Sequence, residues 1–430
     1  MNNHMTEKKW DVYVYGDINT DLIIPNVKKF PESGQEDEVD VMETFVGGGA
    51  ALFALGIGKL GLYPVFQGTI GDDCYGKMIL EELEKNNVDT CLLEVSKEQK
   101  TGISISFTNE HDRAFLTMRG TNALIDVSKV NIEKVKKACH IHVTGYAGSV
   151  NHDAYLNFLQ QVKARTEATV SFDLGWDPAE EWKKEIYDLF PYIDVLFMNE
   201  TEAIHYGRKE TASEAGWDFA KYCPVVALKL GAKGSIAFAN GKMYQKNRYQ
   251  VTAVDTTGAG DSFNAGFIYG YLSGRTMEEC LACGNGCGAL SVTAFGGNTG
   301  FPVEEELWDF ICSNDSIEYV ETNKRERLLM DVSSYIEKNY RDGELEELAK
   351  RLHYDTSWLS KEIKKCTGYS YTALVQNERM KQAAYLLSAT NMKVIEVALT
   401  VGYENISYFH KIFQTKFGMT PRKYRLENKK

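Results

Sequence analysis

The sequence predicts a two-domain protein. The first domain is α/β, with a mainly parallel sheet and a small β lid, and the second is an all-α domain with two helix-turn-helix units. Three observations support this: β-rich runs alternate with helical patterns over residues 1–312, one helical pattern occurs twice in the last hundred residues, and the net charge changes sign between them. A chain of 430 residues also exceeds what one hydrophobic core usually organises. We expect domains at 1–312 and 327–430, joined by a polar linker at 313–326.

The charge is divided unevenly along the chain. The whole sequence carries a formal net charge of −12, but the segment from Arg325 to Lys430 has 19 Lys and Arg against 13 Asp and Glu, which is +6. The residues before this segment therefore carry −18. A basic segment joined to an acidic one suggests that the basic segment meets a polyanion while the acidic part does something else.

No part of the sequence predicts a membrane protein. No apolar run approaches the ~18 residues that a spanning helix needs, and the first ten residues are polar and charged. The nine cysteines are odd in number and scattered, which does not suggest a disulfide framework. We expect a cytoplasmic protein with reduced thiols and no membrane partner.

Six short β-rich runs lie between helical patterns in the first domain. Strands that alternate with helices form βαβ units, so the runs predict a mainly parallel sheet, at whose carboxyl edge ligands bind. Two further runs, Ile103–Phe107 and Ala114–Met118, are joined by the polar turn Thr108–Arg113 and predict an antiparallel hairpin. Together with Leu22–Lys28 the hairpin is expected to form a lid. The six runs are Val12–Tyr15, Val65–Gly68, Ile141–Thr144, Thr169–Asp173, Val195–Met198 and Val225–Leu230.

The loop Asp255-Thr-Thr-Gly-Ala-Gly-Asp-Ser-Phe263 carries the most informative chemistry. The small residues Gly258, Ala259 and Gly260 allow backbone N–H groups to converge on one anion at the positive end of the helix that follows. Asp261 stands beside them, where a carboxylate can accept a proton from a hydroxyl while the N–H groups hold the group under attack. A glycine-rich turn with a capping Asp is the alternative for a lone GAGD, but the nine-residue string is far more specific.

With this loop, the first domain resembles the ribokinase-like (PfkB) carbohydrate kinases, whose signature reads as DTTGAGDSF does. The resemblance covers nearly all of residues 10–305, and the other motifs recur in the right order. They are Gly16-Asp-Ile-Asn-Thr-Asp21, Gly47-Gly-Gly-Ala-Ala51, Gly68-Thr-Ile-Gly-Asp-Asp73, Asn199-Glu-Thr-Glu202 and Lys229-Leu-Gly-Ala-Lys-Gly234.

The resemblance implies catalytic and sugar-binding roles. Asp261 would be the base that activates a sugar hydroxyl, and Gly258–Gly260 would stabilise the charge on the transferring phosphoryl group. Asn19, Asp21 and Gly48 match positions that hold the sugar.

The resemblance also implies ATP and Mg²⁺. Asn199 and Glu202 would order Mg²⁺ and its waters around the nucleotide phosphates. Lys229, Gly231 and Asn285 match positions that line the nucleotide site.

A monovalent cation, K⁺, is implied by part of the pattern. Asp255 and Thr257 match two positions of such a site, but Gly300 stands where a hydroxyl side chain would be expected. Leu52 stands where a ribose-type kinase would be expected to carry Asn, so the resemblance does not point to ribose itself.

The last hundred residues contain the same unit twice. Leu348-Ala-x-x-Leu-x-Tyr354 aligns with Val397-Ala-x-x-Val-x-Tyr403 at an offset of 49 residues, and Trp358–Gly368 aligns with Tyr408–Gly418 at an offset of 50. Each copy has a short amphipathic helix, a tight turn and a second helix, which is a helix-turn-helix pattern. A helical oligomerisation or docking domain is the alternative on periodicity alone, and the repeat and the basic charge count against it.

This region resembles the AraC-type DNA-binding domain, including the closing Gly418-Met-Thr-Pro-x-x-Tyr-Arg425. In that family the second helix of each unit enters the major groove, and the two grooves lie about one turn, ~34 Å, apart. Asp355 is expected to cap the second helix of the first copy, and Arg379, on the helical segment 371–388, to tie the copies together. Residues matching groove-facing positions are Ser357, Trp358, Lys361, Lys364, Asn405, Ile406, Ser407 and Lys411. Expected core residues are Leu359, Ile363, Phe409 and Phe413.

Three readings of the function remain open at this point. The first is a bifunctional protein, expected to be a homodimer, that phosphorylates a carbohydrate with ATP and also binds operator DNA to regulate transcription. The second is a regulator whose kinase fold only senses sugar or nucleotide. Intact Asp261 favours the first, because a sensor needs no base. A plain kinase with a vestigial tail is a third reading.

Overall fold

The structure, a computed structural model, describes residues 8–25, 27, 34, 36, 38–108, 113–146, 148–315, 328–329, 331–352, 354–390 and 392–428. The chain divides into two compact units, Met1–Asn314 and Asp315–Lys430. The last helix of the first unit, α9 (Glu304–Asn314), extends into the predicted linker, and linker residues 316–326 lie outside the described part of the chain. No helix in the described ranges has both the length and the apolar character that crossing a bilayer requires.

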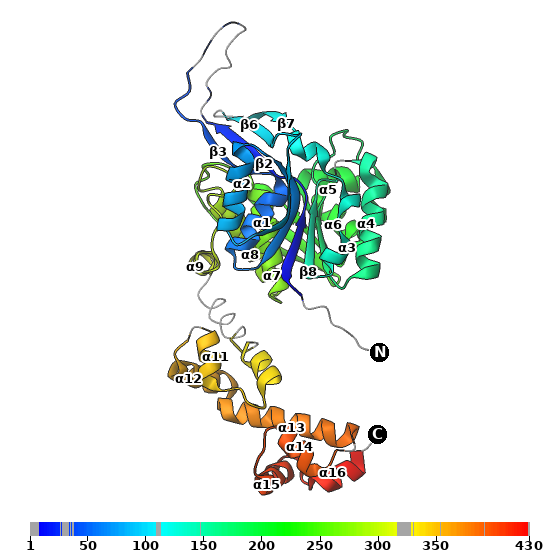
Figure 1. The fold of residues 1–430 in the computed structure, drawn as a ribbon, viewed down its shortest axis with the longest axis vertical. Coiled ribbons are helices and arrows are strands. Elements are labelled where there is room, and N and C mark those ends of the chain that lie inside the picture. The colour runs from blue at the N-terminus through cyan, green and yellow to red at the C-terminus, as the bar shows by residue number, and fades with distance from the viewer. Residues whose placement is uncertain are drawn as a thin grey trace. The chain divides into compact units, whose positions relative to one another are not determined.

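A nine-stranded sheet runs through the first unit (Figure 1). Its strands are β1 (Trp10–Tyr15), β4 (Pro64–Gly71), β5 (Asp89–Ser96), β8 (Ala138–Thr144), β9 (Thr169–Asp173), β10 (Val195–Asn199), β11 (Val225–Lys229), β12 (Ser235–Ala239) and β13 (Lys242–Lys246). Their order is β13-β12-β11-β10-β9-β8-β1-β4-β5. In this spatial order, the seven strands from β11 to β5 are parallel to one another. Strand β12 pairs antiparallel with β11, and β13 pairs antiparallel with β12. All six predicted strands are confirmed. The predicted strands do not include β5, β12 and β13. Strands β5 and β13 are partly exposed edge strands, whereas β12 is buried throughout.

Helices cover both faces of this sheet. Those of the first unit besides α9 are α1 (Gly49–Lys59), α2 (Cys74–Lys85), α3 (Ile132–Val135), α4 (His152–Arg165), α5 (Glu200–Gly207), α6 (Ala212–Phe219), α7 (Ala259–Leu272) and α8 (Met277–Ser291). Alternate residues of a strand point to opposite faces, so in β1 Tyr13 and Tyr15 join one core while Val12 and Val14 join the other. Helices α3 to α6 pack on the first core, and α1, α2, α7, α8 and α9 pack on the second.

Helix α7 packs closely against α8 because both carry glycines at the contact. A Cβ atom on Gly266 would lie 2.5 Å from the Cys283 carbonyl oxygen, and one on Gly270 would lie 3.1 Å from the Cys280 Cα. This backbone-to-backbone packing fixes the axis of α7, and with it the position of the loop at its N-terminus.

A second sheet of four strands forms the predicted lid. Its strands are β2 (Asn19–Ile24), β3 (Glu43–Gly47), β6 (Gly102–Thr108) and β7 (Arg113–Met118), in the order β3-β2-β6-β7. The antiparallel hairpin β6–β7 is confirmed, although its turn residues 109–112 lie outside the described ranges. The predicted strand Leu22–Lys28 was wrong in position, and Lys28 is not described. The strand starts at Asn19 and stops before Pro25, since proline cannot donate a ladder hydrogen bond.

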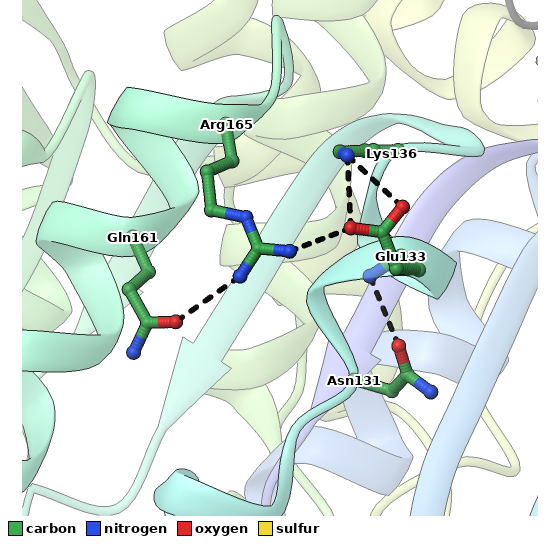
Figure 2. Close-up of polar contacts among 5 residues, drawn as sticks. All are labelled: Asn131, Glu133, Lys136, Gln161 and Arg165. Atoms are coloured by element: carbon green, nitrogen blue, oxygen red, sulfur yellow. Dashed lines mark hydrogen bonds and ion pairs between the residues drawn. The ribbon is translucent and has the colours of Figure 1, made fainter.

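A surface cluster joins α3 to α4, as Figure 2 shows. Glu133 accepts hydrogen bonds from Lys136 at 2.8 and 2.9 Å and from Arg165 at 2.6 Å. Arg165 also donates to Gln161 at 3.4 Å, and the Asn131 side chain caps α3 by accepting from the Glu133 N–H at 2.9 Å. The hydrogen bonds from Lys136 and Arg165, together with their charges, lower the pKa of Glu133. None of these five residues lines the cavities described below.

The second unit has two small cores joined by one long helix. Residues 331–339 are helical, and the following helices are α11 (Leu345–Arg351), α12 (Thr356–Thr367), α13 (Tyr371–Ala389), α14 (Val394–Thr400), α15 (Ile406–Phe417) and α16 (Pro421–Asn428). Val375 and Met380 of α13 belong to different cores, so this helix connects the two helix-turn-helix units. The predicted core residues are confirmed as fully buried: Leu359, Ile363, Phe409 and Phe413.

Two further predictions for this unit are confirmed. The Asp355 carboxylate caps α12 by accepting from the Trp358 N–H at 2.9 Å. The Arg379 guanidinium donates to the carbonyl oxygens of Tyr340, Arg341 and Gly402 at 2.7, 2.8 and 3.0 Å. Arg379 therefore holds the loop before the first helix-turn-helix copy and the turn within the second copy at the same time.

Candidate functional site

Two cavities open at the carboxyl edge of the parallel strands and contain most of the predicted kinase residues. The larger measures about 1010 Å³ and the smaller about 350 Å³. The predicted residues lining the larger cavity are Asn19, Asp21, Gly48, Glu202, Lys229, Thr257, Gly258 and Asp261. Those lining the smaller cavity are Lys229, Gly231, Ala259, Gly260 and Asn285. Asn199 and Asp255 line neither cavity.

The N-terminus of α7 lies at the boundary between the two cavities. Gly258 caps this helix with φ +71°, and a Cβ atom there would lie 2.7 Å from the Gly297 carbonyl oxygen. Only glycine fits both the backbone conformation and the space. The first-turn N–H groups of a helix have no partner within the helix, so this end of α7 can bind an anion.

Asp261 lies in the first turn of α7, next to this anion-binding end. Burial raises the pKa of its carboxyl group to about 7; the Lys229 ammonium opposes this rise, and the charges of Asp173, Asp17 and Asp21 add to it. A carboxylate with a pKa near neutrality can accept a proton from a hydroxyl and release it again. Asp261 therefore lies where a carboxylate could exchange a proton with a hydroxyl bound in the larger cavity.

Asp17 organises the floor of the larger cavity. Its carboxylate accepts hydrogen bonds from the N–H groups of Gly49 and Ala50 at 2.9 and 3.2 Å, and from the Thr144 hydroxyl at 3.0 Å. Gly48 has φ +92°, and a Cβ atom there would lie 2.6 Å from the Asp17 carbonyl oxygen. Asp17 thus caps α1 and brings Gly48 and Gly49 up to the cavity. In the sequence, Asp17 stands out only as part of the motif Gly16–Asp21.

A polar group on the lid side comprises Asn19, Asp21 and Asn122. Asn19 donates to Asp21 at 2.7 Å, and Asn122 donates to Asn19 at 3.4 Å while accepting from the Ile18 N–H at 3.0 Å. Burial raises the pKa of Asp21 to about 6. Sequence reasoning missed Asn122, which follows the lid strand β7 and lines the same cavity. Amide and carboxylate groups of this kind suit an acceptor with several hydroxyls.

Asn199 and Glu202 form a capping box at the start of α5. The Asn199 side chain accepts from the Glu202 N–H at 2.8 Å, and Glu202 accepts from the Asn199 N–H at 2.9 Å. Burial and the Asp173 charge raise the pKa of Glu202. Carboxylate oxygens fit Mg²⁺, which binds proteins through one or two carboxylates plus substrate phosphates. Of the predicted pair, Glu202 lines the cavity, while Asn199 holds it in place.

Asn285 forms part of the wall of the smaller cavity. Its amide donates to the carbonyl oxygens of Lys246 and Asn247, both at 3.1 Å, and accepts from the Ser235 hydroxyl at 2.9 Å. These bonds use both amide hydrogens, so Asn285 fixes the chain after β13 against the cavity. The remaining lining is largely apolar, with Val251, Ala253, Ala289 and Val292 among its residues.

The residues predicted for a monovalent cation stabilise the loop itself. Asp255 accepts from the Thr257 N–H and hydroxyl at 2.9 and 2.8 Å, and from the Gly296 N–H at 3.1 Å. A Cβ atom on Gly300 would lie 2.6 Å from the Leu290 carbonyl oxygen. The backbone at 300 therefore leaves no room for the hydroxyl side chain that the resemblance implies at this position.

Two side chains that the sequence analysis missed contact Lys229. Its ammonium donates to Asp173 at 2.6 Å and to Asn264 at 3.3 Å, and Asn264 donates to Asp173 at 2.6 Å. Although burial alone would lower it, the Asp173 and Glu202 charges raise the pKa of Lys229. Asp173 is the last residue of a predicted strand, at the edge of the sheet where ligands bind. That position could have identified it as a candidate site residue from the sequence.

In the second unit, the predicted groove-facing residues of α12 are all exposed: Ser357, Trp358, Lys361 and Lys364. Trp358 stacks on Tyr354 with ring centroids 4.6 Å apart, and its side chain remains 44% exposed. This arrangement presents an aromatic face and two ammonium groups on one helix.

The second copy differs in detail. Ser407 and Lys411 are exposed, whereas Ile406 is half-buried and packs on the core. Asn405 is exposed, but its side chain caps α15 by accepting from the Tyr408 N–H at 3.0 Å. The two copies thus share a framework and offer different surfaces.

Comparison with known proteins agrees with this geometry. The model of the pfkB family carbohydrate kinases matches residues 9–304, and that of a helix-turn-helix domain matches residues 348–427. An uncharacterized sugar kinase of Archaeoglobus fulgidus is 30% identical over 251 residues, covering 58% of this chain and 98% of that protein. A 5-dehydro-2-deoxygluconokinase of Bacillus velezensis is 27% identical over 329 residues, covering 72% of this chain and 97% of that protein.

Among solved structures, Arabidopsis thaliana ribokinase complexed with ribose and ATP superposes with a TM-score of 0.62 at 25% identity, covering 70% of this chain and 98% of that one. This match adds the ribokinase-like fold to the family match. The chain therefore belongs to the pfkB family of carbohydrate kinases and carries an AraC-type helix-turn-helix domain after its kinase domain.

Proposed function

We propose that the protein phosphorylates a carbohydrate hydroxyl with ATP and also binds operator DNA to regulate transcription. The observation that carries the kinase proposal is the position of Asp261. It lies in the first turn of α7, where the cavity lined by Asn19, Asp21 and Asn122 meets the smaller, mainly apolar cavity.

The acceptor sugar is proposed to bind in the larger cavity, with hydrogen bonds to Asn19, Asp21 and Asn122. The nucleobase of ATP fits the smaller, mainly apolar cavity, as is usual for planar ligands. This arrangement directs the triphosphate towards the N-terminus of α7 and Lys229. Mg²⁺, held through Glu202, would neutralise phosphate charge when bound.

In the proposed reaction Asp261 accepts the proton of the acceptor hydroxyl as its oxygen bonds to the γ-phosphorus. The bond between that phosphorus and the leaving oxygen of ADP breaks. The N–H groups at Gly258–Gly260 stabilise the charge on the phosphoryl group in transit. This chemistry depends mainly on positioning and charge neutralisation, and the site has groups for both.

A phosphorylation screen of sugars and sugar acids with ATP and Mg²⁺ tests the kinase proposal. We expect turnover of at least one acceptor and loss of that turnover in Asp261→Asn. If the wild-type chain binds nucleotide and sugar but transfers no phosphoryl group, the kinase domain is a sensor.

The DNA proposal rests on the two exposed helices α12 and α15 and on the +6 charge of the segment from Arg325 onward. Lys361, Lys364 and Lys411 are exposed on these helices, as phosphate and base contacts require. Binding to fragments of its own operon, measured against unrelated DNA, tests this proposal.

We also propose a homodimer. The edge strand β7 exposes Phe115, Leu116 and Met118 at 54, 64 and 48%, which is more apolar surface than an isolated edge usually presents. Light scattering of the wild-type chain and of Leu116→Lys tests it, and a monomeric wild type would refute it.

A further inference from the structure

Lys229 holds a position that no other described residue shares, because it lines both cavities. Apart from it, the cavities meet at the start of α7, where Gly258 and Asp261 line the larger one and Ala259 and Gly260 the smaller one. A phosphoryl group that leaves ATP for a sugar must cross this boundary. Lys229 therefore lies on the transfer path.

Two buried side chains fix the Lys229 ammonium. Its Nζ atom lies 2.6 Å from Asp173 Oδ2 and 3.3 Å from Asn264 Oδ1. Asn264 in turn donates to the same Asp173 oxygen at 2.6 Å, which closes a triangle of hydrogen bonds. Asp173 is 9% exposed and Asn264 is fully buried. A lysine ammonium usually moves freely on a four-carbon stem, and here two hydrogen bonds hold it.

That position is next to the anion-binding loop. A Cβ atom on Gly260 would lie 3.4 Å from the Lys229 Nζ atom. The sheet explains the arrangement, since β9, β10 and β11 are adjacent and parallel and end in Asp173, Asn199 and Lys229. Asn264 comes from α7 itself, one turn after Gly260.

The charges around this point require a fixed cation. Asp173, Glu202 and Asp261 all interact electrostatically with Lys229, and the phosphates of ATP would add further negative charge. A fixed ammonium stabilises the transferring phosphoryl group without having to reorient during the reaction. A mobile ammonium would first have to reorient.

We propose that Asp173 and Asn264 are positioning residues that hold Lys229 against Gly260, so that its ammonium neutralises the phosphoryl group as it passes between the cavities. This inference rests on the proposed kinase function. Lys229 keeps its proton throughout: the acceptor oxygen bonds to the γ-phosphorus, the leaving oxygen takes the electron pair to ADP, and Asp261 receives the acceptor proton.

A double-mutant cycle in the full chain tests the coupling. Lys229→Met and Asp173→Asn should each lower kcat by about 10- to 100-fold, with the acceptor KM changed less than about threefold. In the Lys229→Met background, Asp173→Asn should cause no further loss and should restore some activity, because it removes an uncompensated carboxylate. Asn264→Leu should follow the same pattern. Losses that multiply in the double variants, or a wild-type kcat in Asp173→Asn, would overturn the proposal.

A matched pair elsewhere in the unit supplies the control. Lys163 contacts Asp194 with the same 2.6 Å distance but lines neither cavity. Lys163→Met and Asp194→Asn should leave kcat and KM unchanged. Their melting temperatures show how much destabilisation the loss of a similar ion pair causes by itself.

Nucleotide binding tests the inference independently of turnover. Calorimetry compares the affinities for MgADP and for a non-hydrolysable MgATP analogue. In Lys229→Met and Asp173→Asn the preference for the triphosphate should fall by about tenfold. If the wild type phosphorylates no acceptor, the proposed function fails, but an unchanged preference in both variants would overturn this inference in either case.

Discussion

Asp261 lies directly against Gly49: a Cβ atom on Gly49 would be 3.0 Å from the Asp261 Oδ1 atom. The starts of α1 and α7 therefore meet at the carboxylate that we propose as the base. Asp17 holds Gly49 in place by accepting its N–H at 2.9 Å. The position of the base thus depends on two helices that are more than 200 residues apart in the sequence.

Gly49→Ala should lower kcat by about 10- to 100-fold, because its methyl group would displace the Asp261 carboxylate from the acceptor hydroxyl. The φ angle of Gly49 does not fall in the left-handed region, so alanine causes no backbone strain there. Steady-state kinetics together with a melting curve checks this. A variant with an unchanged melting temperature and full activity would show that the contact does not matter.

Asp261→Asn should lower kcat by about 10²- to 10⁴-fold, the usual contribution of a general base, while nucleotide affinity is largely retained. The matched control is Glu133→Gln in the surface cluster of Figure 2, which also changes a carboxylate to an amide but lies outside both cavities. A similar loss in both variants would argue against a specific role for Asp261.

The rate should depend on pH through the same carboxyl group. Asp261 acts as a base only when ionised, and burial raises its pKa to about 7. The value of kcat/KM, which reports the free enzyme, should therefore fall about tenfold per unit as the pH drops below about 7 and level off above it. A profile measured from pH 5.5 to 8.5 checks this, and a flat profile would contradict it.

DNA binding by the full chain should weaken steeply as salt rises, because Lys and Arg side chains displace phosphate counterions. Lys361→Ala and Lys364→Ala should each reduce the slope of the logarithm of the DNA-binding constant against the logarithm of the salt concentration by about one. Lys163→Ala, in the other unit, serves as the control and should not change the slope. Salt-independent binding, or none to its own operon, would favour a docking domain instead.

Sugar and DNA should each change the affinity for the other. The lid strands β2, β6 and β7 border the larger cavity through Asn19, Ser104 and Thr117, so a bound sugar can favour one lid position. Coupling free energies are typically ~1–3 kcal/mol, which is about 5- to 150-fold in affinity, and they are reciprocal. The measurement is a titration of operator DNA into Asp261→Asn, with and without sugar and nucleotide. Equal affinities would mean that the units are only tethered.

The sequence analysis predicted those features that short stretches of chain carry by themselves. The loop containing Asp261 is recognisable because nine consecutive residues combine small side chains with one carboxylate. The helix-turn-helix copies are recognisable because apolar residues such as Leu359 and Phe409 recur at helical spacing, and the structure confirms that both are buried. The strand Leu22–Lys28 was misplaced because the polar residues Asn19 and Asp21 concealed where the strand begins.

The sequence by itself therefore determined the two fold classes, six of the nine strands of the main sheet and the local anion-binding loop. Only the tertiary structure decided which distant residues meet: Lys229 and Asp173 are 56 positions apart, and Asn264 and Asp173 are 91 apart. Local hydrogen bonding and hydrophobic periodicity act over a few residues and can be read along the chain. The order of parallel strands depends on how helices pack on both faces of the sheet, and that order places β9 and β11 on either side of β10.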